Sequence, residues 1–249
     1  MINLIKAELY QLKVRRSPKI WLLMSIIMSA AVVMLPYFLG SDIQSNLRIP
    51  DFIIIGTYAD IATAMAPYLL LGLTITAFNN DNKHRTMVNS ASIGYSRLTI
   101  YFSKMIVALI FAVAFLLVSF LSFVITIQIF YSTDLQSLYD VVITNAFLSY
   151  LPIWIAYLSL YVAVLFVSDG AMPMIVLMIS LVMMPLFLNL GSLATTVIRN
   201  IRPYFLTELT PSSTVSLFGI ENASTILAVL YILVFTVVGT TLFKRKEIK

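Results

Sequence analysis

The run LTIYFSKMIVALIFAVAFLLVSFLSFVITIQIFY, residues 98–131, decides the fold class of this chain. About 20 predominantly apolar residues are enough for one helix to cross the hydrocarbon core of a bilayer. At a helical rise of about 1.5 Å per residue, this run is longer than a bilayer requires. We therefore expect the helix to tilt, or its first turns to project from the membrane into the cytoplasm.

Apolar runs of similar character recur along the whole chain, which is 60% hydrophobic and only 11% charged and has a mean hydropathy of +0.97. An ordinary soluble domain carries about 25% charged residues and could not bury so much apolar surface. The sequence predicts an all-α membrane protein, a single transmembrane domain of residues 1–249. Its six predicted spans are Ile20–Leu39, Phe52–Phe78, Leu98–Tyr131, Val141–Val167, Met172–Leu190 and Thr225–Phe243.

The distribution of basic residues predicts the orientation of these spans. With a cytoplasmic N-terminus, 13 of the 16 Lys and Arg residues fall on the cytoplasmic side, and only Arg48, Arg199 and Arg202 fall outside. This asymmetry follows the positive-inside rule, and six spans return the basic C-terminus to the cytoplasm. The basic residues form no single patch that could follow a nucleic-acid backbone, so no nucleic-acid partner is expected. We expect a multi-pass protein of the plasma membrane with both termini cytoplasmic.

Residues 1–17 precede the first span and have amphipathic character. Ile2, Ile5, Leu9 and Leu12 share one helical face, which predicts a helix lying in the membrane interface, although a solvated tail is the alternative. Ser17 and Pro18 then fit the N-cap and first turn of a separate helix.

Two of the connections are long. Residues 79–97, on the cytoplasmic side, are polar and basic. Residues 191–222, on the outer side, are too apolar for a free loop, and Pro203 and Pro211 break them too often for a full span. Backbone at membrane depth must satisfy its hydrogen bonds internally or against other protein. This outer segment is therefore expected to form short re-entrant or surface helices that seal the outer exit, with Phe205 as a candidate gate residue.

The motifs of hydrolytic, redox and metal chemistry are missing from the sequence. The chain has no cysteine, no Gly-x-x-x-x-Gly-Lys loop for nucleotide phosphates and no His-Glu-x-x-His for zinc. Its single histidine, His84, lies in the basic connection, where a solvated side chain is expected. We expect no catalytic residue, no metal site and no cofactor on this chain, and no enzyme activity of its own.

Asp60 is a candidate residue of a translocation path. It lies about eight residues into the second predicted span, roughly 12 Å deep at helical rise. Acidic residues inside membranes normally face a bundle interior or a wet cavity. The alternative is that the span begins later and Asp60 lies near the outer interface. Tyr58 lies within a turn of it, and Arg199 or Arg202 could supply a countercharge.

The cytoplasmic connection carries a pattern known from one transporter family. Residues 78–86, FNNDNKHRT, are followed by SIGYSR at 92–97 and by Lys104. This resembles the cytoplasmic loop of type-two ABC exporter permeases, in which an acidic residue and a basic-Thr or Gly-Thr pair precede a short helix. A Gly/Pro-Ser-Arg turn and a lysine then open the third span. Asp81 stands where glutamate is commoner, and Arg85 where glycine is often found.

The likeness covers the full chain, including the N-terminal interfacial helix, the six spans and the helical insertion before the sixth. It implies that residues 79–97 form a coupling helix that docks on a separate ABC ATPase subunit, which binds ATP and Mg²⁺. It also implies a second permease subunit, identical or homologous. The residues expected to contact the ATPase are Asp81, Lys83, Arg85, Met87, Val88, Ile93 and Arg97.

In its small size the chain most resembles permeases of Gram-positive peptide exporters, including lantibiotic-immunity, bacitracin-resistance and cytolytic-peptide export systems. The expected cargo is an amphipathic or antimicrobial peptide or a hydrophobic drug. The alternative functions are a secondary carrier or channel not powered by ATP and a non-transporting membrane sensor. Carriers usually show repeated halves or paired broken helices, and no convincing repeat relates the first and last three spans.

Overall fold

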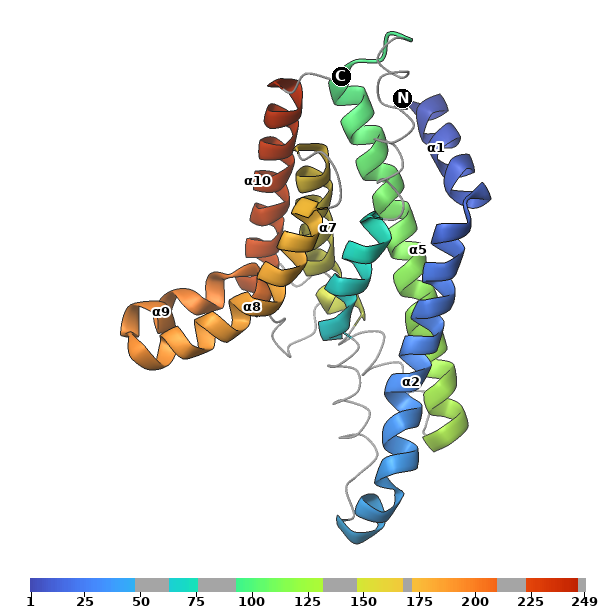
Figure 1. The fold of residues 1–249 in the computed structure, drawn as a ribbon, viewed down its shortest axis with the longest axis vertical. Coiled ribbons are helices and arrows are strands. Elements are labelled where there is room, and N and C mark those ends of the chain that lie inside the picture. Colours follow the sequence, from blue (N-terminus) through green and yellow to red (C-terminus); the bar gives the residue numbers. More distant parts are fainter. Residues whose placement is uncertain (48–62, 76–92, 132–146, 168–171, 210–222, 246–249) are drawn as a thin grey trace.

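A computed structural model describes residues 1–47, 63–75, 93–131, 147–167, 172–209 and 223–245, and every regular element in these ranges is helical (Figure 1). The elements are α1 (Ile2–Val14), α2 (Arg16–Leu47), the helix Thr63–Ile75 drawn in teal in Figure 1, α5 (Arg97–Tyr131), α7 (Ser149–Val167), α8 (Met172–Ala194), α9 (Thr196–Ile201), the 3-10 helices η2 (Arg202–Tyr204) and η3 (Leu206–Glu208), and α10 (Ala223–Arg245). The predicted all-α class is confirmed for these residues.

Among the described residues, four helices are long and apolar enough to cross a membrane. They are Arg16–Met34 within α2, Arg97–Phe130 within α5, Ser149–Val167 and Ala223–Arg245. Two shorter apolar helices, Thr63–Ile75 and Ile175–Gly191, coincide with parts of the second and fifth predicted spans. Residues 52–62, 76–78 and 141–146 of the predicted spans lie outside the described residues.

The junction between the first two helices differs from the prediction. The break falls at Arg15, whose backbone is extended (φ −64°, ψ 142°), and not at Ser17 and Pro18. Helix α2 begins at Arg16 and contains both of those residues in its first turn. Proline is tolerated there because the N–H groups of a first turn have no intrahelical acceptor. The predicted N-terminal helix of residues 1–17 is therefore shorter and ends at Val14.

Helix α1, the start of α5 and the end of α10 lie at the same end of the bundle, the upper end of Figure 1. We call this the terminal end. Helix α1 packs along α5, and α2 continues along the same neighbour. On the other side of α5, α7 packs extensively against α10. Helix α5 therefore lies between α1 and α2 on one side and the pair α7 and α10 on the other.

Helix α7 contributes much of the buried core, and a glycine on α10 lets the two helices approach closely. A Cβ atom at Gly239 would lie 2.5 Å from Tyr101 Oη of α5 and 2.9 Å from the Cβ of Ala163. The Phe166 ring of α7 packs beside this crossing, with its centroid 5.0 Å from that of Tyr101 in a tilted arrangement and 4.8 Å from that of Phe243 in an edge-to-face arrangement. Small residues at such crossings allow the dispersion contacts that hold membrane helices together.

Five buried serine and threonine hydroxyl groups in these apolar helices are satisfied within their own helix. Each donates a hydrogen bond to a carbonyl three or four residues earlier, a common solution where water is excluded. The pairs are Ser25 with Leu22, Thr74 with Leu70, Ser103 with Ile100, Ser119 with Phe115, and Ser159 with Ala156.

Candidate functional site

A tight turn leads the chain into α5 at the terminal end. Gly94 has a positive φ of 96°, a backbone conformation that residues with a Cβ atom rarely adopt. Ser96 then caps the helix, because its Oγ accepts a hydrogen bond from the Thr99 amide at 3.2 Å. Ile93, just before the turn, is 75% exposed. Helix α5 thus begins directly after Gly94-Tyr95-Ser96, and the turn before it leaves the apolar side chain of Ile93 on the surface.

Arg97 joins the start of α5 to the end of α10. Its Nη1 donates a 2.6 Å hydrogen bond to the backbone carbonyl of Lys244. The last carbonyls of a helix carry partial negative charge and no intrahelical donor, so a guanidinium is a favourable partner. A displacement of the turn before α5 would therefore reach α10 directly.

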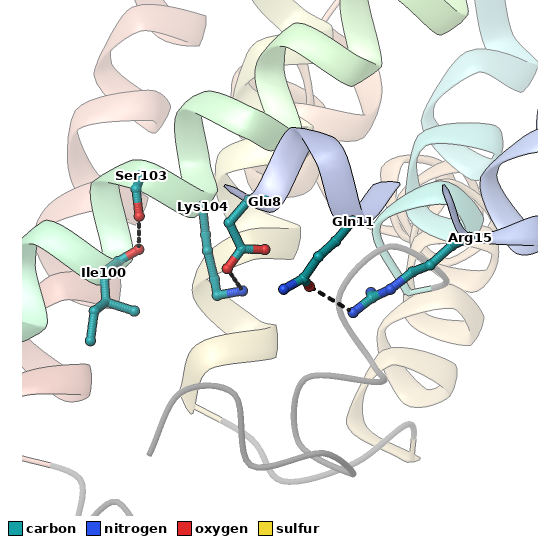
Figure 2. Close-up of polar contacts among 6 residues, drawn as sticks. All are labelled: Glu8, Gln11, Arg15, Ile100, Ser103 and Lys104. Carbon is teal, nitrogen blue, oxygen red and sulfur yellow. Dashed lines mark hydrogen bonds and ion pairs between the residues drawn. The ribbon is translucent and has the colours of Figure 1, made fainter. Parts of the chain in front are cut away.

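Lys104 and Glu8 form a buried ion pair between α5 and α1. Lys104 Nζ lies 2.8 Å from Glu8 Oε1, and the exposed fractions of the two side chains are 2% and 9% (Figure 2). On α1 the buried positions are Leu4, Glu8 and Leu12, one helical turn apart. Figure 2 also shows Gln11 turned toward Arg15, whose Nη2 donates to it at 3.2 Å.

The ion pair joins α1 to α5 at one position along both helices. Removing one partner would leave the other charge buried, at a cost of about 3–5 kcal/mol. The terminal end therefore holds three helices in fixed contact, with α1 and α10 both attached to the start of α5.

The coupling residues expected from the sequence are only partly described. Asp81, Lys83, Arg85, Met87 and Val88 lie outside the described residues. Ile93 and Arg97 lie at the terminal end as given above, and the Arg97 side chain is engaged with α10.

A cavity of about 270 Å³ lies between the helix Thr63–Ile75, α7, α8 and η3. Four aromatic side chains line it, Tyr68, Tyr150, Trp154 and Tyr157. Every lining residue in the described part of the chain is uncharged. These described residues therefore suit an apolar group with neutral polar atoms.

Two tyrosine hydroxyls bind the segment that contains η2 and η3, beside this cavity. Tyr157 Oη of α7 donates to the Leu206 carbonyl at 3.2 Å, and Tyr231 Oη of α10 donates to the Tyr204 carbonyl at 2.9 Å. Within the segment, Arg202 Nη2 lies 2.8 Å from Glu208 Oε2. Arg202 is thus paired with Glu208. Asp60 lies outside the described residues, so a countercharge from Arg199 or Arg202 stays a prediction.

Two candidate residues of the translocation path, Asp60 and Tyr58, lie outside the described residues. Phe205 is half-buried between η2 and η3 and is not a lining residue of the cavity, whereas its neighbours Leu206 and Thr207 are.

The cavity-lining residues of α7 are not among the site residues expected from the sequence. A signal for them exists, because Tyr150, Trp154, Tyr157 and Tyr161 follow a spacing of four, three and four and so share one helical face.

The comparisons with known proteins agree with this architecture. The family model described as ABC-2 family transporter protein matches residues 4–184, well over half of the 249-residue chain. No curated protein matches the chain. The matched region runs from α1 into α8 and so includes α1, the start of α5 and the α7 side of the cavity. This chain belongs to the ABC-2 family of membrane transporter proteins.

Proposed function

We propose that this chain is the permease subunit of an ATP-driven exporter in the plasma membrane. A separate ATPase subunit hydrolyses ATP and docks on residues 79–97, and a second permease subunit completes the membrane domain. The cargo is an amphipathic or antimicrobial peptide or a hydrophobic drug, as in lantibiotic-immunity, bacitracin-resistance and cytolytic-peptide export systems. The basic terminal end faces the cytoplasm.

Family membership is the observation that carries this proposal. The arrangement at the terminal end supports it in physical terms. Residues 79–97 lead directly into α5, which is tied to α1 by the Glu8–Lys104 pair and to α10 by Arg97. A push on that segment would move three helices together, as a rigid-body switch between inward and outward states requires.

The proposal is tested by measuring which energy source drives transport. Inverted membrane vesicles from the native cells should accumulate a fluorescent cationic amphipathic peptide with ATP, and not with ADP or in vesicles from a deletion strain. A protonophore should leave this uptake intact. Uptake that needs a proton gradient but not ATP would instead identify a secondary carrier, and no uptake of any amphipathic cargo would favour a sensor.

A further inference from the structure

The strongest unassigned feature of the molecule is the aromatic cavity beside α7, because it contains buried polar atoms without partners. Trp154 is 2% exposed, and its Nε1 has no hydrogen-bond partner among the described residues. The same holds for the buried hydroxyl oxygen of Thr207. Both residues line the cavity, Trp154 from α7 and Thr207 from η3.

An indole N–H can only donate, so whatever satisfies Trp154 must present an acceptor. Leaving such a group buried and unpaired costs about 1–3 kcal/mol. The Nε1 atom is covered by protein, so a ligand carbonyl would recover this cost once the Trp154 ring turns toward the cavity. The lining residues that the structure describes are all uncharged, so none of them would pair with a charged ligand atom.

The aromatic lining defines the remainder of the ligand. The Tyr150 and Trp154 rings stack at 6.0 Å with an interplanar angle of 25°, and Tyr157 follows one turn later. Such faces and edges attract another aromatic ring in offset or edge-to-face contact. A volume of about 270 Å³ is at the lower end of ligand pockets, so it suits one side chain with its adjoining carbonyl better than a whole peptide.

We propose that this cavity binds an aromatic residue of an amphipathic peptide, with a neutral backbone carbonyl accepting a hydrogen bond from Trp154 and the Thr207 hydroxyl as second polar contact. This inference rests on the proposed function for the cargo class. It identifies a subsite within one copy of the chain, formed by the helix Thr63–Ile75, α7, α8 and η3.

The chain supplies its own reporter, because it contains only two tryptophans, Trp21 and Trp154. In Trp21→Phe, Trp154 is the only tryptophan, and in Trp154→Phe, Trp21 is; excitation on the long-wavelength side of tyrosine absorption selects the indole. Trp21 packs toward Gly72 and does not line the cavity, so it is a matched control. The probe is N-acetyl-4-bromophenylalanine amide, whose bromine quenches indole fluorescence on contact. The protein is the full chain in lipid nanodiscs.

We expect saturable quenching of Trp154 and only weak, linear quenching of Trp21. Thr207→Val in the Trp21→Phe background keeps the shape and should weaken binding about threefold to tenfold, the range of one net hydrogen bond. If Trp21→Phe does not fold, Trp21→Tyr serves as the background.

Equal linear quenching of both tryptophans would overturn the proposal, since it would mean that the probe is merely dissolved in lipid. Saturable quenching that Thr207→Val leaves unchanged would overturn the polar recognition. The measurement needs neither ATP nor an ATPase. A negative result here therefore leaves the exporter proposal standing, and a failure of ATP-driven uptake leaves this binding result standing.

Discussion

Lys104 Nζ of α5 lies 2.8 Å from Glu8 Oε1 of α1, and both side chains are more than nine-tenths buried. We expect Lys104→Met or Glu8→Leu alone to destabilise the folded state by ~3–5 kcal/mol, because each leaves the other charge buried without its partner. The double variant should recover most of that loss. Thermal unfolding in detergent measures the effect, and Lys13→Met, at an exposed position of α1, is the control.

If the single variants matched the control, the pair would contribute nothing. If the double variant lost the sum of the two single losses, the residues would act independently, and the contact between α1 and α5 would not depend on this pair.

A second prediction concerns the crossing of α5, α7 and α10. Gly239→Ala places a methyl group 2.5 Å from Tyr101 Oη and 2.9 Å from Ala163 Cβ, so overpacking should cost about 1–3 kcal/mol. Tyr101→Phe should be nearly neutral, because that hydroxyl has no hydrogen-bond partner among the described residues. Combined with Gly239→Ala, it should recover part of the loss. Additive losses in the unfolding midpoint would contradict the close approach.

A third prediction uses the lack of native cysteines. The sequence alone suggests that Val197 and Leu206 are both shielded, but the structure separates them, with exposed fractions of 65% and 8%. Leu206→Cys should react at least about tenfold more slowly than Val197→Cys with a small thiol reagent that enters both water and lipid. Tyr157→Phe removes the hydrogen bond to the Leu206 carbonyl and should speed the reaction at position 206. Equal rates in the parent variants would show that η3 is not packed.

The sequence predicts α5 to within one residue at its start and correctly at its end, because a long apolar run admits only a helix once a membrane surrounds it. The buried stripe of α1 is predicted only in part. Of the predicted residues, Leu12 is buried and Ile5 and Leu9 pack against the core, but Ile2 is exposed. The other buried positions are Leu4 and Glu8. Packing against a single neighbouring helix selects a narrower stripe than a membrane surface does.

The ion pair was also within reach of the sequence, and it shows where sequence reasoning ends. Lys104 is the only charged side chain in residues 98–131, and Glu8 is the only acid in residues 1–17. Each is costly in an apolar setting, which signals that each needs a partner. That they are partners of each other depends on α1 folding back along α5, a tertiary relationship that no local pattern contains.

A fourth prediction concerns Asp60, which lies outside the described residues. A carboxylate at a helix centre costs about 2.5–3.5 kcal/mol even on the milder insertion scales, a cost that a cavity or a partner would remove. If Asp60 faces the cargo route, Asp60→Asn should lower peptide export and leave expression and ATPase binding intact. Asp60→Leu with full export would place the residue at the lipid interface and remove it from the path.

Docking of an ATPase at residues 79–97 is the central feature of the proposed exporter. Co-purification measures this docking directly. The chain, solubilised gently from native membranes, should bring down an ATPase that carries a Gly-x-x-x-x-Gly-Lys loop. Met87→Asp with Val88→Asp should reduce the recovered ATPase by about tenfold or more without preventing membrane insertion, because buried apolar anchors dominate interface energetics. Ile93→Asp should have the same direction of effect, and Val197→Asp, at an exposed position of α9, should have none. Recovery of the ATPase at the wild-type level with the double variant, or of no such ATPase with the wild type, would contradict the account.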